Sequence, residues 1–580
     1  MAENKSSGLH RAKTWEIALY ALNNTSTNLY MSLVGYISYY LVGIIGTTVV
    51  FAGSFVTIMR IWDGVTDPIV GMLVDKTNTK FGKNRPFIVI GNVILFATTW
   101  FMFNIIPTIG QGMRLPVFIV IYMIYVLGYT AQCVVTKSAQ SCLTNDPQQR
   151  PTFSMFDMVY NTLALSVIIP IYVSDTLVPK FTLKLSQHKD QLLELIEKTP
   201  SLLKVLESTK AEGVTKLDIA AGEAVNFAKL SSEEALEIVN NLDGYLADYP
   251  KVADVALNAF YNPEFFSFFH LIIGGIAAVC ACLAVFGLAR KDRQEYFGTG
   301  EVQKVTIKDY ADVLAHNRGI QMLIVAASSD KLSLSMQTNG TIMVCIFGIM
   351  AGNYSYFGSQ SAIAAIPTVV LGLLGMGVVA KKLGQKMALV VGTVGALASA
   401  AGMFLLFLLG DPSSMVLPIV SLTKPATWAN LLVGANWSMF GVLYIVFWCL
   451  MKGFSGIASS IVIPMTADCA DYEVYRSGRY VPGLMGTLFS FVDKVISSFA
   501  ATLVSLMFAA IGFKEVLPTA ETPYSDGIFW VCMACLIGAP CVGWILNVVA
   551  MKFYPLSKEK MESIQERIAE IKAEAMKKKA

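Results

Sequence analysis

Charged side chains are scarce in this sequence. They make up 15% of its 580 residues, whereas an average soluble domain carries roughly 25%. Hydrophobic residues reach 54%, and the mean hydropathy is +0.57. The formal net charge is only +3, and the Lys and Arg residues cluster in loops instead of forming one basic face. These features argue against a soluble domain and against a nucleic-acid partner.

Histidine and paired cysteine are also lacking. The four His residues are scattered, at positions 10, 188, 270 and 316, and Cys532-x-x-Cys535 lies within an apolar run without a second pair. We interpret the ten Cys residues as small buried hydrophobic groups and predict no resident cofactor or metal. Neither a nucleophile–base arrangement nor a phosphate-binding glycine loop is found, so an enzyme is not expected. The polar, basic first 14 residues do not indicate a cleaved signal peptide.

Long apolar runs, in contrast, are abundant. A helix needs about 20 apolar residues to cross the hydrocarbon core of a bilayer. Twelve runs are long enough, at 17–44, 48–74, 86–107, 115–143, 152–178, 262–289, 319–350, 356–380, 386–410, 435–463, 484–512 and 527–553. The sequence therefore predicts an all-α membrane protein with twelve crossings and with both termini on the same side.

The short loops predict the orientation. Cations are concentrated at 10–13, 76–85, 290–318, 381–386 and after 552, whereas the loops near 45, 110, 352, 411–434 and 513–526 carry few. Cytoplasmic loops hold the excess of Lys and Arg. We expect a multi-pass protein of the cell inner (plasma) membrane with both termini in the cytoplasm.

An insert of about 80 residues, 180–258, separates crossings five and six. It contains nine Lys against thirteen Asp and Glu, and apolar residues recur at helical spacing in 190–208 and 231–250. Ser231 to Glu234 are typical of a capped helix start. We predict a small helical cap outside the membrane, either as a solvated decoration or as a gate or docking site.

The two halves of the chain resemble each other weakly. A basic loop with glycine joins crossings two and three after Gly71, and a similar loop joins crossings eight and nine after Gly375. Parallel repeats of six helices would produce this pattern. The expected organisation is 1–179 and 259–290 as the first six-helix bundle, 180–258 as the insert, 291–318 as a cytoplasmic inter-bundle loop, 319–553 as the second bundle and 554–580 as a cytoplasmic tail.

Ionisable groups at membrane depth cost at least about 2.5 to 3.5 kcal/mol each on insertion scales, so they indicate function. In crossing two, Asp63 and Asp67 share one helical face at i and i+4, and Thr66 adds an oxygen. Two carboxylates and neutral oxygens suit Na⁺ or a shared proton. We predict a cation site here; the alternative is that Arg60 simply neutralises Asp63.

Crossing eleven contains Asp493 and Lys494 near mid-membrane. Adjacent residues on a helix point about 100° apart, so only one of them faces a given neighbour. If crossings two and eleven meet, Lys494 is the natural counter-charge for Asp63 and Asp67, and cation binding would compete with that salt bridge. A purely structural bridge is the alternative.

Crossings one and seven are polar at equivalent places, which favours a substrate cavity between the halves. The candidate substrate-binding residues are Asn23, Asn24, Ser26, Trp62, Asp330, Lys331 and Gln337. Trp62 could stack on a sugar ring. Ordinary interhelical hydrogen bonding is the alternative for the uncharged members.

Two further sets of charges lie nearer the predicted cytoplasmic side. Lys137 and Asp157 are expected to form an ion pair between crossings four and five, with contact to the substrate as the alternative. A cytoplasmic gate of conformation-dependent salt bridges is predicted from Asp75, Lys83, Arg85, Asp468 and Asp471, with a merely solvated loop as the alternative.

Three motifs resemble the glycoside-pentoside-hexuronide:cation symporter family. They are Arg60-Ile-Trp-Asp63-x-x-x-Asp67-Pro68, the loop Phe81 to Pro86, and Ala467-Asp468-x-x-Asp471-Tyr472-x-x-Tyr475, and Lys494 stands where the family has a crossing-eleven lysine. The resemblance covers the chain except 180–258. It implies a major facilitator fold, a cation site at Asp63 and Asp67, and an important Lys494.

The sequence departs from the family at other positions. Where a sugar carrier of the family has substrate-contacting acids in crossings one and four, this chain has Ser26 and Val135. The family's crossing-four tryptophan falls on Ala139, and its crossing-five arginine falls at about Asp157 or Met158. A galactoside held by the same groups is therefore not expected.

The leading functional hypothesis is symport of a sugar, glycoside or sugar acid with Na⁺ or H⁺ by alternating access. One alternative is a transporter of an amphiphilic or lipid-like organic anion. Another is a non-transporting membrane sensor or scaffold, against which the buried charges argue. The expected partners are a small carbohydrate and the lipid bilayer, with no nucleic acid, and the chain is expected to act as a monomer.

Overall fold

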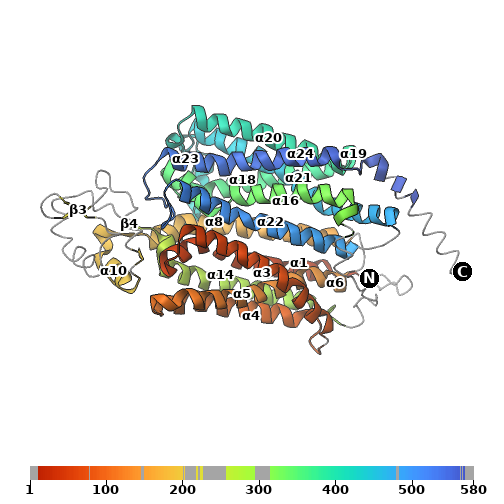
Figure 1. Ribbon diagram of the computed structural model, residues 1–580, viewed down its shortest axis with the longest axis horizontal. Coiled ribbons are helices and arrows are strands. Elements are labelled where there is room, and N and C mark those ends of the chain that lie inside the picture. The colour runs from red at the N-terminus through yellow and green to blue at the C-terminus, as the bar shows by residue number, and fades with distance from the viewer. Residues whose placement is uncertain are drawn as a thin grey trace.

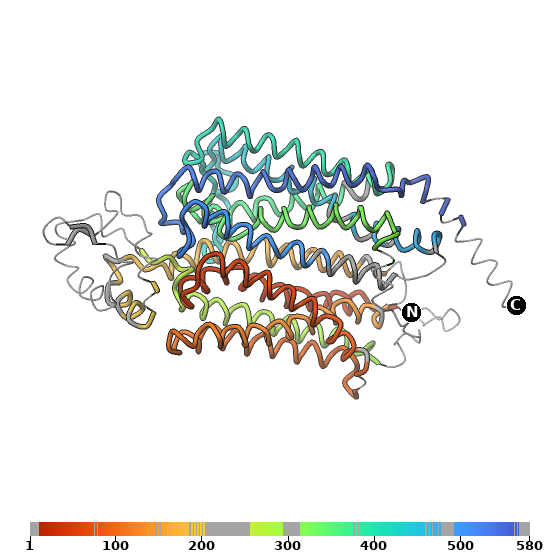
Figure 2. The backbone as a smooth tube through the Cα atoms, in the orientation of Figure 1, coloured from red at the N-terminus to blue at the C-terminus, as the bar shows by residue number. Residues whose placement is uncertain are grey.

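The computed structural model describes residues 11–77, 79–144, 149–199, 201–202, 217–219, 223–225, 256–293, 312, 314–477, 482–561, 563–564 and 566–567. Long helices run along one axis, and α6 and α19, near the first and last described helices, lie at the opposite end of the bundle from α10 and β4 (Figure 1). We call these the terminal end and the insert end. Figure 2 shows that the first half of the chain, residues 11–293, gathers on one side of the bundle and the second half, 314–567, on the other.

The first half contains six long helical paths. Their elements are α1 (Thr14–Val34), α2 (Ile37–Tyr40) and η1 (Leu41–Ile45); α3 (Val49–Lys76); α4 (Arg85–Trp100), η2 (Phe101–Ile105) and η3 (Ile106–Thr108); α5 (Gln111–Ser138) and α6 (Gln140–Leu143); α7 (Arg150–Asn161), η4 (Thr162–Ile168), α8 (Ile169–Ile171), η5 (Tyr172–Leu177) and α9 (Val178–Phe181); and α14 (Pro263–Leu288).

The second half repeats the pattern. Its elements are α16 (Arg318–Gln337), α17 (Gly340–Met343) and η10 (Val344–Met350); α18 (Ser355–Leu374), η11 (Gly375–Ala380) and α19 (Lys381–Leu383); α20 (Gln385–Leu409); α21 (Met439–Ser477); α22 (Pro482–Ala510); and α23 (Asp526–Met533), η15 (Ala534–Gly538) and α24 (Ala539–Phe553). Three short 3₁₀ segments lie between α20 and α21: η12 (Pro412–Ser414), η13 (Pro425–Leu432) and η14 (Gly434–Asn436).

The helices that are long enough to span a membrane agree with the predicted crossings. In the described part of the chain, ten helices are long and apolar enough to cross a bilayer, and the pair Arg318–Gln337 with Gly340–Met350, bent by 45°, makes an eleventh. The described apolar part of α22, Lys494–Ala510, is shorter. These segments lie at the twelve ranges predicted from the sequence.

The insert begins and ends beside the bundle. Strands β1 (Leu183–Lys184) and β4 (Ala256–Leu257) pair antiparallel and bring the two ends of the insert together. Helix α10 (Leu185–Lys198) follows β1, and β2 (Leu217–Ile219) pairs with β3 (Glu223–Val225). These short strands were not predicted. The predicted helix over 231–250 lies outside the described residues.

Arg114 links the insert to the first bundle. Its guanidinium donates to the carbonyl of Lys198 at 2.7 Å and to that of Ile44 at 2.9 Å, and the side chain is buried. A buried cation needs such acceptors to replace water. The end of α10 is therefore fixed against the helices.

The two halves pack against each other along two lines of contact. Helix α3 lies against α22, and α18 lies against η4, α8 and η5. At the insert end, the hydroxyls of Tyr39 and Tyr261 donate to the carbonyls of Pro518, at 2.9 Å, and Leu517, at 3.0 Å. Buried aromatic residues around these contacts belong to one core that includes both halves.

Candidate functional site

The predicted cation site lies on α3. The side chain of Thr48 caps the start of this helix by accepting a hydrogen bond from the Phe51 amide at 3.3 Å. From there the helix continues through Pro68 to Lys76, so Asp63 and Asp67 lie one turn apart on one face. Asp63 is 2% exposed, which is unusual for an ionised side chain unless it is paired.

Lys494 of α22 reaches both carboxylates. Its Nζ lies 2.5 Å from Oδ2 of Asp67 and 3.2 Å from Oδ2 of Asp63. Arg60 contributes a second cation, with Nη1 3.7 Å from Oδ2 of Asp63. Two cations and two anions therefore compensate one another within the interface of α3 and α22. The role of this cluster in cation binding stays a prediction.

Helix α5 completes the environment of Asp63 with residues that the sequence did not single out. Thr130 donates its hydroxyl to Oδ1 of Asp63 at 2.9 Å and lies 3.0 Å from the hydroxyl of Thr66. The guanidinium of Arg60 lies 5.6 Å from the centre of the Tyr129 ring. A neutral Thr in an apolar helix gives no charge signal, and this explains why Thr130 was not predicted.

The polar side chains of α1 are bonded to neighbouring helices of the first half. Asn23 donates to the hydroxyl of Thr136 at 2.6 Å, and Ser26 donates to the carbonyl of Ala277 at 2.9 Å. Both are buried. Interhelical hydrogen bonding, the alternative stated for these residues, is therefore what the structure shows.

Asn24 and Trp62 also have partners within the first half. Asn24 donates to Oδ1 of Asp157 at 2.8 Å, and the indole of Trp62 lies 3.4 Å from the carbonyl of Met123. Asp157 is half-buried, and Lys137 is exposed. In the described part of the chain no ion pair joins those two residues, so the prediction of that pair is wrong. The amides of Asn24 and Asn161 bind Asp157 instead.

On α16, Asp330 and Gln337 point into the second half. Asp330 accepts a hydrogen bond from the indole of Trp544 at 2.8 Å, whereas Lys331 is exposed. Gln337 accepts from the ammonium of Lys452 on α21 at 2.5 Å and donates to the carbonyl of Leu536. Lys452 was missed, although a lysine within the apolar run 435–463 was a visible signal.

Two of the predicted gate residues, Lys83 and Arg85, contact a residue that the sequence did not single out. Buried Asp292 accepts hydrogen bonds from the backbone amides of Lys83 at 3.1 Å and Arg85 at 2.9 Å, and it lies 3.7 Å from the Arg85 guanidinium. Asp468, in contrast, lines a cavity of the second half. The predicted pairing of Asp468 or Asp471 with Lys83 or Arg85 is therefore not found among the described residues.

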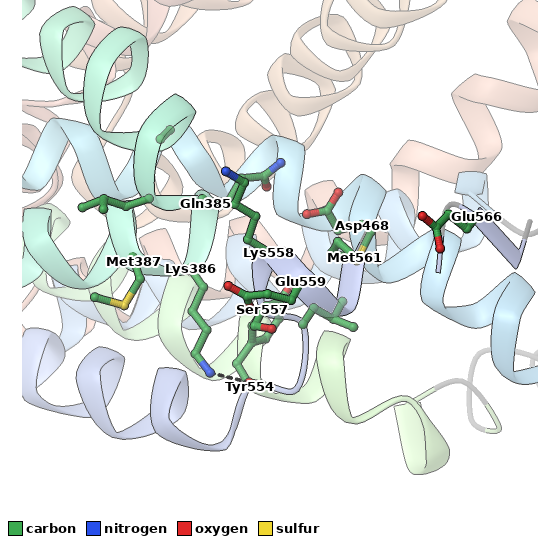
Figure 3. A pocket seen from close by; sticks show the side chains of 14 residues that line it. Gln385, Lys386, Met387, Asp468, Tyr554, Ser557, Lys558, Glu559, Met561 and Glu566 are labelled. Atoms are coloured by element: carbon green, nitrogen blue, oxygen red, sulfur yellow. Dashed lines mark hydrogen bonds between the residues drawn. The ribbon is translucent and has the colours of Figure 1, made fainter. Parts of the chain in front are cut away.

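The cavity that Asp468 lines has a volume of about 780 Å³ and lies in the second half at the terminal end. Figure 3 shows Asp468 on the opposite side of this cavity from Lys386, with Lys558 between them. The dashed bond from the Lys386 ammonium to the carbonyl of Tyr554 measures 2.7 Å. Burial, and secondarily Asp471, raises the pKa of Asp468 to about 6. The side chains of Asp75 and Asp493 lie outside the described residues.

A bundle of membrane-crossing helices in two halves, with a cluster of charges buried between them, defines a polytopic membrane transporter of the major facilitator type. Residues 20–177 and 255–558 match the family described as MFS/sugar transport protein, and the chain belongs to that family. The unmatched residues between these ranges coincide with the insert. This match confirms the resemblance noted in the sequence, and it identifies a transporter family and not an enzyme family.

Individual relatives agree with this assignment. The isoprimeverose transporter of Lactiplantibacillus pentosus is 28% identical over 157 residues, which are 26% of this chain and 32% of that protein. The putative glycoside/cation symporter YagG of Escherichia coli (strain K12) is 27% identical over 153 residues, 26% of this chain and 33% of that protein. These matches span about a third of the relatives' length.

Two comparisons extend over the whole chain. The uncharacterized symporter sll1374 of Synechocystis sp. is 21% identical over 574 residues, which cover 92% of this chain and 93% of that protein. The crystal structure of the nucleoside transporter NupG has a TM-score of 0.50 at 12% identity and covers 94% of this chain and 100% of that one. At this identity the likeness concerns the fold alone.

Proposed function

We propose that the chain is a cation-coupled symporter that carries a sugar, glycoside or sugar acid by alternating access, with Na⁺ or H⁺ as the coupling ion. The observation that carries this proposal is the position of Lys494 between Asp63 and Asp67, at 3.2 and 2.5 Å. The names of relatives, which include an isoprimeverose transporter and a glycoside/cation symporter, support the substrate class.

The coupling mechanism follows from competition for the carboxylates. A cation or proton that binds Asp63 and Asp67 weakens their attraction for Lys494, because the same oxygens cannot satisfy both charges fully. Lys494 belongs to the second half and the two acids to the first. Ion binding therefore changes the energy of contact between halves that move relative to one another during alternating access.

The location follows from the loop charges. We propose that the terminal end faces the cytoplasm and the insert end faces the outside of the inner (plasma) membrane, because the Lys-rich and Arg-rich loops lie with the termini. Residues of the spanning helices such as Val93, Ile366 and Val279 expose large apolar side chains, which a lipid bilayer would cover.

Transport by reconstituted protein tests the proposal. Proteoliposomes loaded with candidate sugars are assayed for uptake of labelled sugar with a Na⁺ gradient, a proton gradient or no gradient. We expect one ion gradient to drive accumulation, and we expect Asp63→Cys to abolish that accumulation while exchange of sugar across the membrane persists.

Asp411→Cys serves as the matched control, because Asp411 is an exposed aspartate of the loop between α20 and α21. It should leave coupled uptake unchanged. If no gradient drives accumulation of any sugar, or if Asp63→Cys keeps full gradient dependence, the assignment of the coupling site is refuted.

A further inference from the structure

A large cavity of the second half lies apart from the Asp63 and Lys494 cluster. It is the cavity of about 780 Å³ that Asp468 lines, between the turn from α19 to α20, the end of α21 and the chain that follows α24. The Lys386 ammonium fixes one wall by donating to the carbonyl of Tyr554 at 2.7 Å. Ligand pockets of proteins commonly measure about 300 to 1,000 Å³, so this cavity is large enough for a small ligand or a headgroup.

The charges around this cavity are separated instead of paired. Lys386 and Asp468 lie on opposite sides of it, with Lys558 between them (Figure 3). In the part of the chain that the structure describes, half-buried Asp468 forms no ion pair, and the charged side chain that acts on it, Asp471, has the same sign. Partial burial of an anion is unfavourable without a compensating cation. A positively charged group of a ligand would compensate Asp468.

Gln385 gives an independent indication of a ligand that donates hydrogen bonds. This residue also lines the cavity, and its buried Oε1 has no hydrogen-bond partner in the described structure. A buried acceptor without a donor loses its hydration and gains nothing in return. An ammonium group in the cavity would supply the donor that Gln385 lacks as well as the charge that Asp468 lacks.

The two lysines favour a phosphate in the same ligand. Lys386 uses one of its three N–H donors on Tyr554, and Lys558 is exposed at the cavity. Glu559 and Glu566 also line the cavity, so its charges do not favour a ligand that is purely anionic. A phosphate ester that carries an ammonium group a few bonds away matches both kinds of charge.

The depth of the cavity in the membrane indicates the source of such a ligand. Ala380 ends one membrane-spanning segment, Gln385 begins the next, and both line the cavity. Lipid headgroups lie just outside the hydrocarbon core, at the ends of such segments, and pockets with basic side chains at this level bind headgroups. Leu383 and Met387 of the same wall are 50% and 47% exposed, and they offer an apolar surface to the acyl chains of a lipid.

We propose that this cavity binds the headgroup of phosphatidylethanolamine, with the phosphate on Lys386 and Lys558 and the ammonium on Asp468. The lipid belongs to the leaflet at the terminal end of the bundle. Its headgroup joins the turn between α19 and α20 to α21 and to the chain after α24. This site is separate from the transport site, and it depends neither on the identity of the substrate nor on that of the coupling ion.

Three lipids with the same dioleoyl chains test the headgroup. Phosphatidylethanolamine carries a phosphate and a primary ammonium, phosphatidylcholine carries a quaternary ammonium that cannot donate a hydrogen bond, and phosphatidylglycerol carries no cation. Binding of the first lipid molecule to the purified, lipid-depleted full-length protein in detergent is measured by native mass spectrometry. We expect phosphatidylethanolamine to bind about tenfold more tightly than phosphatidylglycerol, because it adds a charge-assisted hydrogen bond, and also more tightly than phosphatidylcholine.

Variants assign this preference to the cavity. Asp468→Asn keeps the shape of the side chain but removes its charge, so it should lower the affinity for phosphatidylethanolamine to that for phosphatidylglycerol. Lys386→Gln and Lys558→Gln should each weaken the binding of all three lipids, which share the phosphate. If Lys386→Gln does not fold, Lys558→Gln alone tests the phosphate contact. Asp411→Asn and Lys424→Gln, at exposed residues of the loop between α20 and α21, are the matched controls and should leave all three affinities unchanged.

Equal affinity of the wild-type protein for phosphatidylethanolamine and phosphatidylglycerol, or an unchanged preference in Asp468→Asn, would overturn the proposal. Tighter binding of phosphatidylglycerol would identify a site for anionic lipid and overturn it as well. Soluble O-phosphoethanolamine distinguishes a lipid from a free phosphate ester. If it displaces phosphatidylethanolamine at equal concentration, the acyl chains contribute nothing and the lipid is not the occupant. Failure to displace it supports the lipid.

Discussion

Lys494 is bound by two carboxylates from the other half of the chain, and its surroundings decide how much that contact stabilises the protein. Asp63 is 2% exposed, whereas the Asp67 and Lys494 side chains are 31% and 20% exposed. Breaking a buried pair is costly because it leaves one charge without compensation. Partial access of water to Asp67 and Lys494 reduces that cost.

A double-mutant cycle on Asp67→Asn and Lys494→Gln measures this contact. We expect each variant to lower stability, and the two effects to be coupled by roughly 0.5 to 3 kcal/mol, because the ammonium and the carboxylate lie 2.5 Å apart. Stability is measured by denaturant unfolding of the protein in detergent micelles.

Glu194 and Lys198 of α10 offer a control with the same 2.5 Å separation but with side chains 65% and 64% exposed. Exposed i, i+4 pairs contribute about 0.3 to 0.5 kcal/mol. Equal coupling in both cycles, or additive effects for Asp67 and Lys494, would show that the contact between the halves is no stronger than a surface pair.

The sequence allowed much of this cluster to be predicted, because charges in an apolar run are visible without a structure. Asp63, Asp67 and Lys494 were recognised in this way, and their meeting required only that α3 and α22 be neighbours. Thr130 could not be recognised, since its role depends on its contact with Asp63. Similarly, the partner of Asn23 lies 113 residues away in the chain.

At the scale of helices, apolar length predicted the crossings well, whereas their ends and loops depend on tertiary contacts. Asp292, just after α14, binds three successive backbone amides at the start of α4, from Lys83, Asn84 and Arg85. Nothing in the spacing of these residues, more than 200 positions apart, indicates that contact. The sequence therefore did not reveal that Asp292 holds the loop of Arg85, and the part of Arg85 in a gate stays a prediction.

The end of α21 gives a pH-dependent prediction. Burial, and secondarily Asp471, raises the pKa of Asp468 from the ordinary value of 3.8 to about 6. The folded protein therefore binds more protons than the unfolded chain between about pH 4 and 6, so stability falls as pH rises through that window. Asp468→Asn should remove this fall and raise the melting temperature at pH 7.5 more than at pH 4.5.

Thermal unfolding in detergent between pH 4.5 and 7.5 checks this expectation. Asp411→Asn is the control, because the hydroxyl of Ser413 lowers the pKa of Asp411 from 3.8, so Asp411 titrates below the range measured. The raised pKa of Asp468 would be contradicted if the melting temperature of the wild-type protein rose between pH 4.5 and 6. It would also be contradicted if the melting temperature of Asp468→Asn changed with pH in the same way as that of the wild-type protein.

Over the whole molecule, contacts between the halves are unevenly distributed. The insert end is closed by the tyrosine bonds to Leu517 and Pro518 and by the Val49 amide, which donates to the carbonyl of Lys514 at 2.9 Å. Between described residues, the pair of Lys494 and Asp67 is the last polar contact between the halves toward the terminal end. The structure is thus closed at the insert end.

Two glycines permit this closure. A Cβ on Gly53 of α3 would lie 2.4 Å from the Ser505 hydroxyl and 2.6 Å from the Ala501 carbonyl of α22. A Cβ on Gly358 of α18 would lie 2.7 Å from the Cα of Ile171. Neither helix pair can approach as closely with a larger side chain, so both lines of contact between the halves depend on the absence of a Cβ.

Gly53→Val should therefore favour opening of the insert end. Overpacking costs about 1 to 3 kcal/mol, which corresponds to roughly 5- to 150-fold in an equilibrium between two states. Hydrogen–deuterium exchange measures the opening at the backbone amides of Val49 and Leu517, both of which form hydrogen bonds across the halves.

Gly71→Val is the control on the same helix, because nothing lies within 4 Å of a Cβ there. Faster exchange at these two amides in Gly53→Val alone, with unchanged exchange elsewhere in both bundles, is the expected result. Uniformly faster exchange throughout would instead indicate general destabilisation, and unchanged exchange would show that closure does not depend on the contact of α3 with α22.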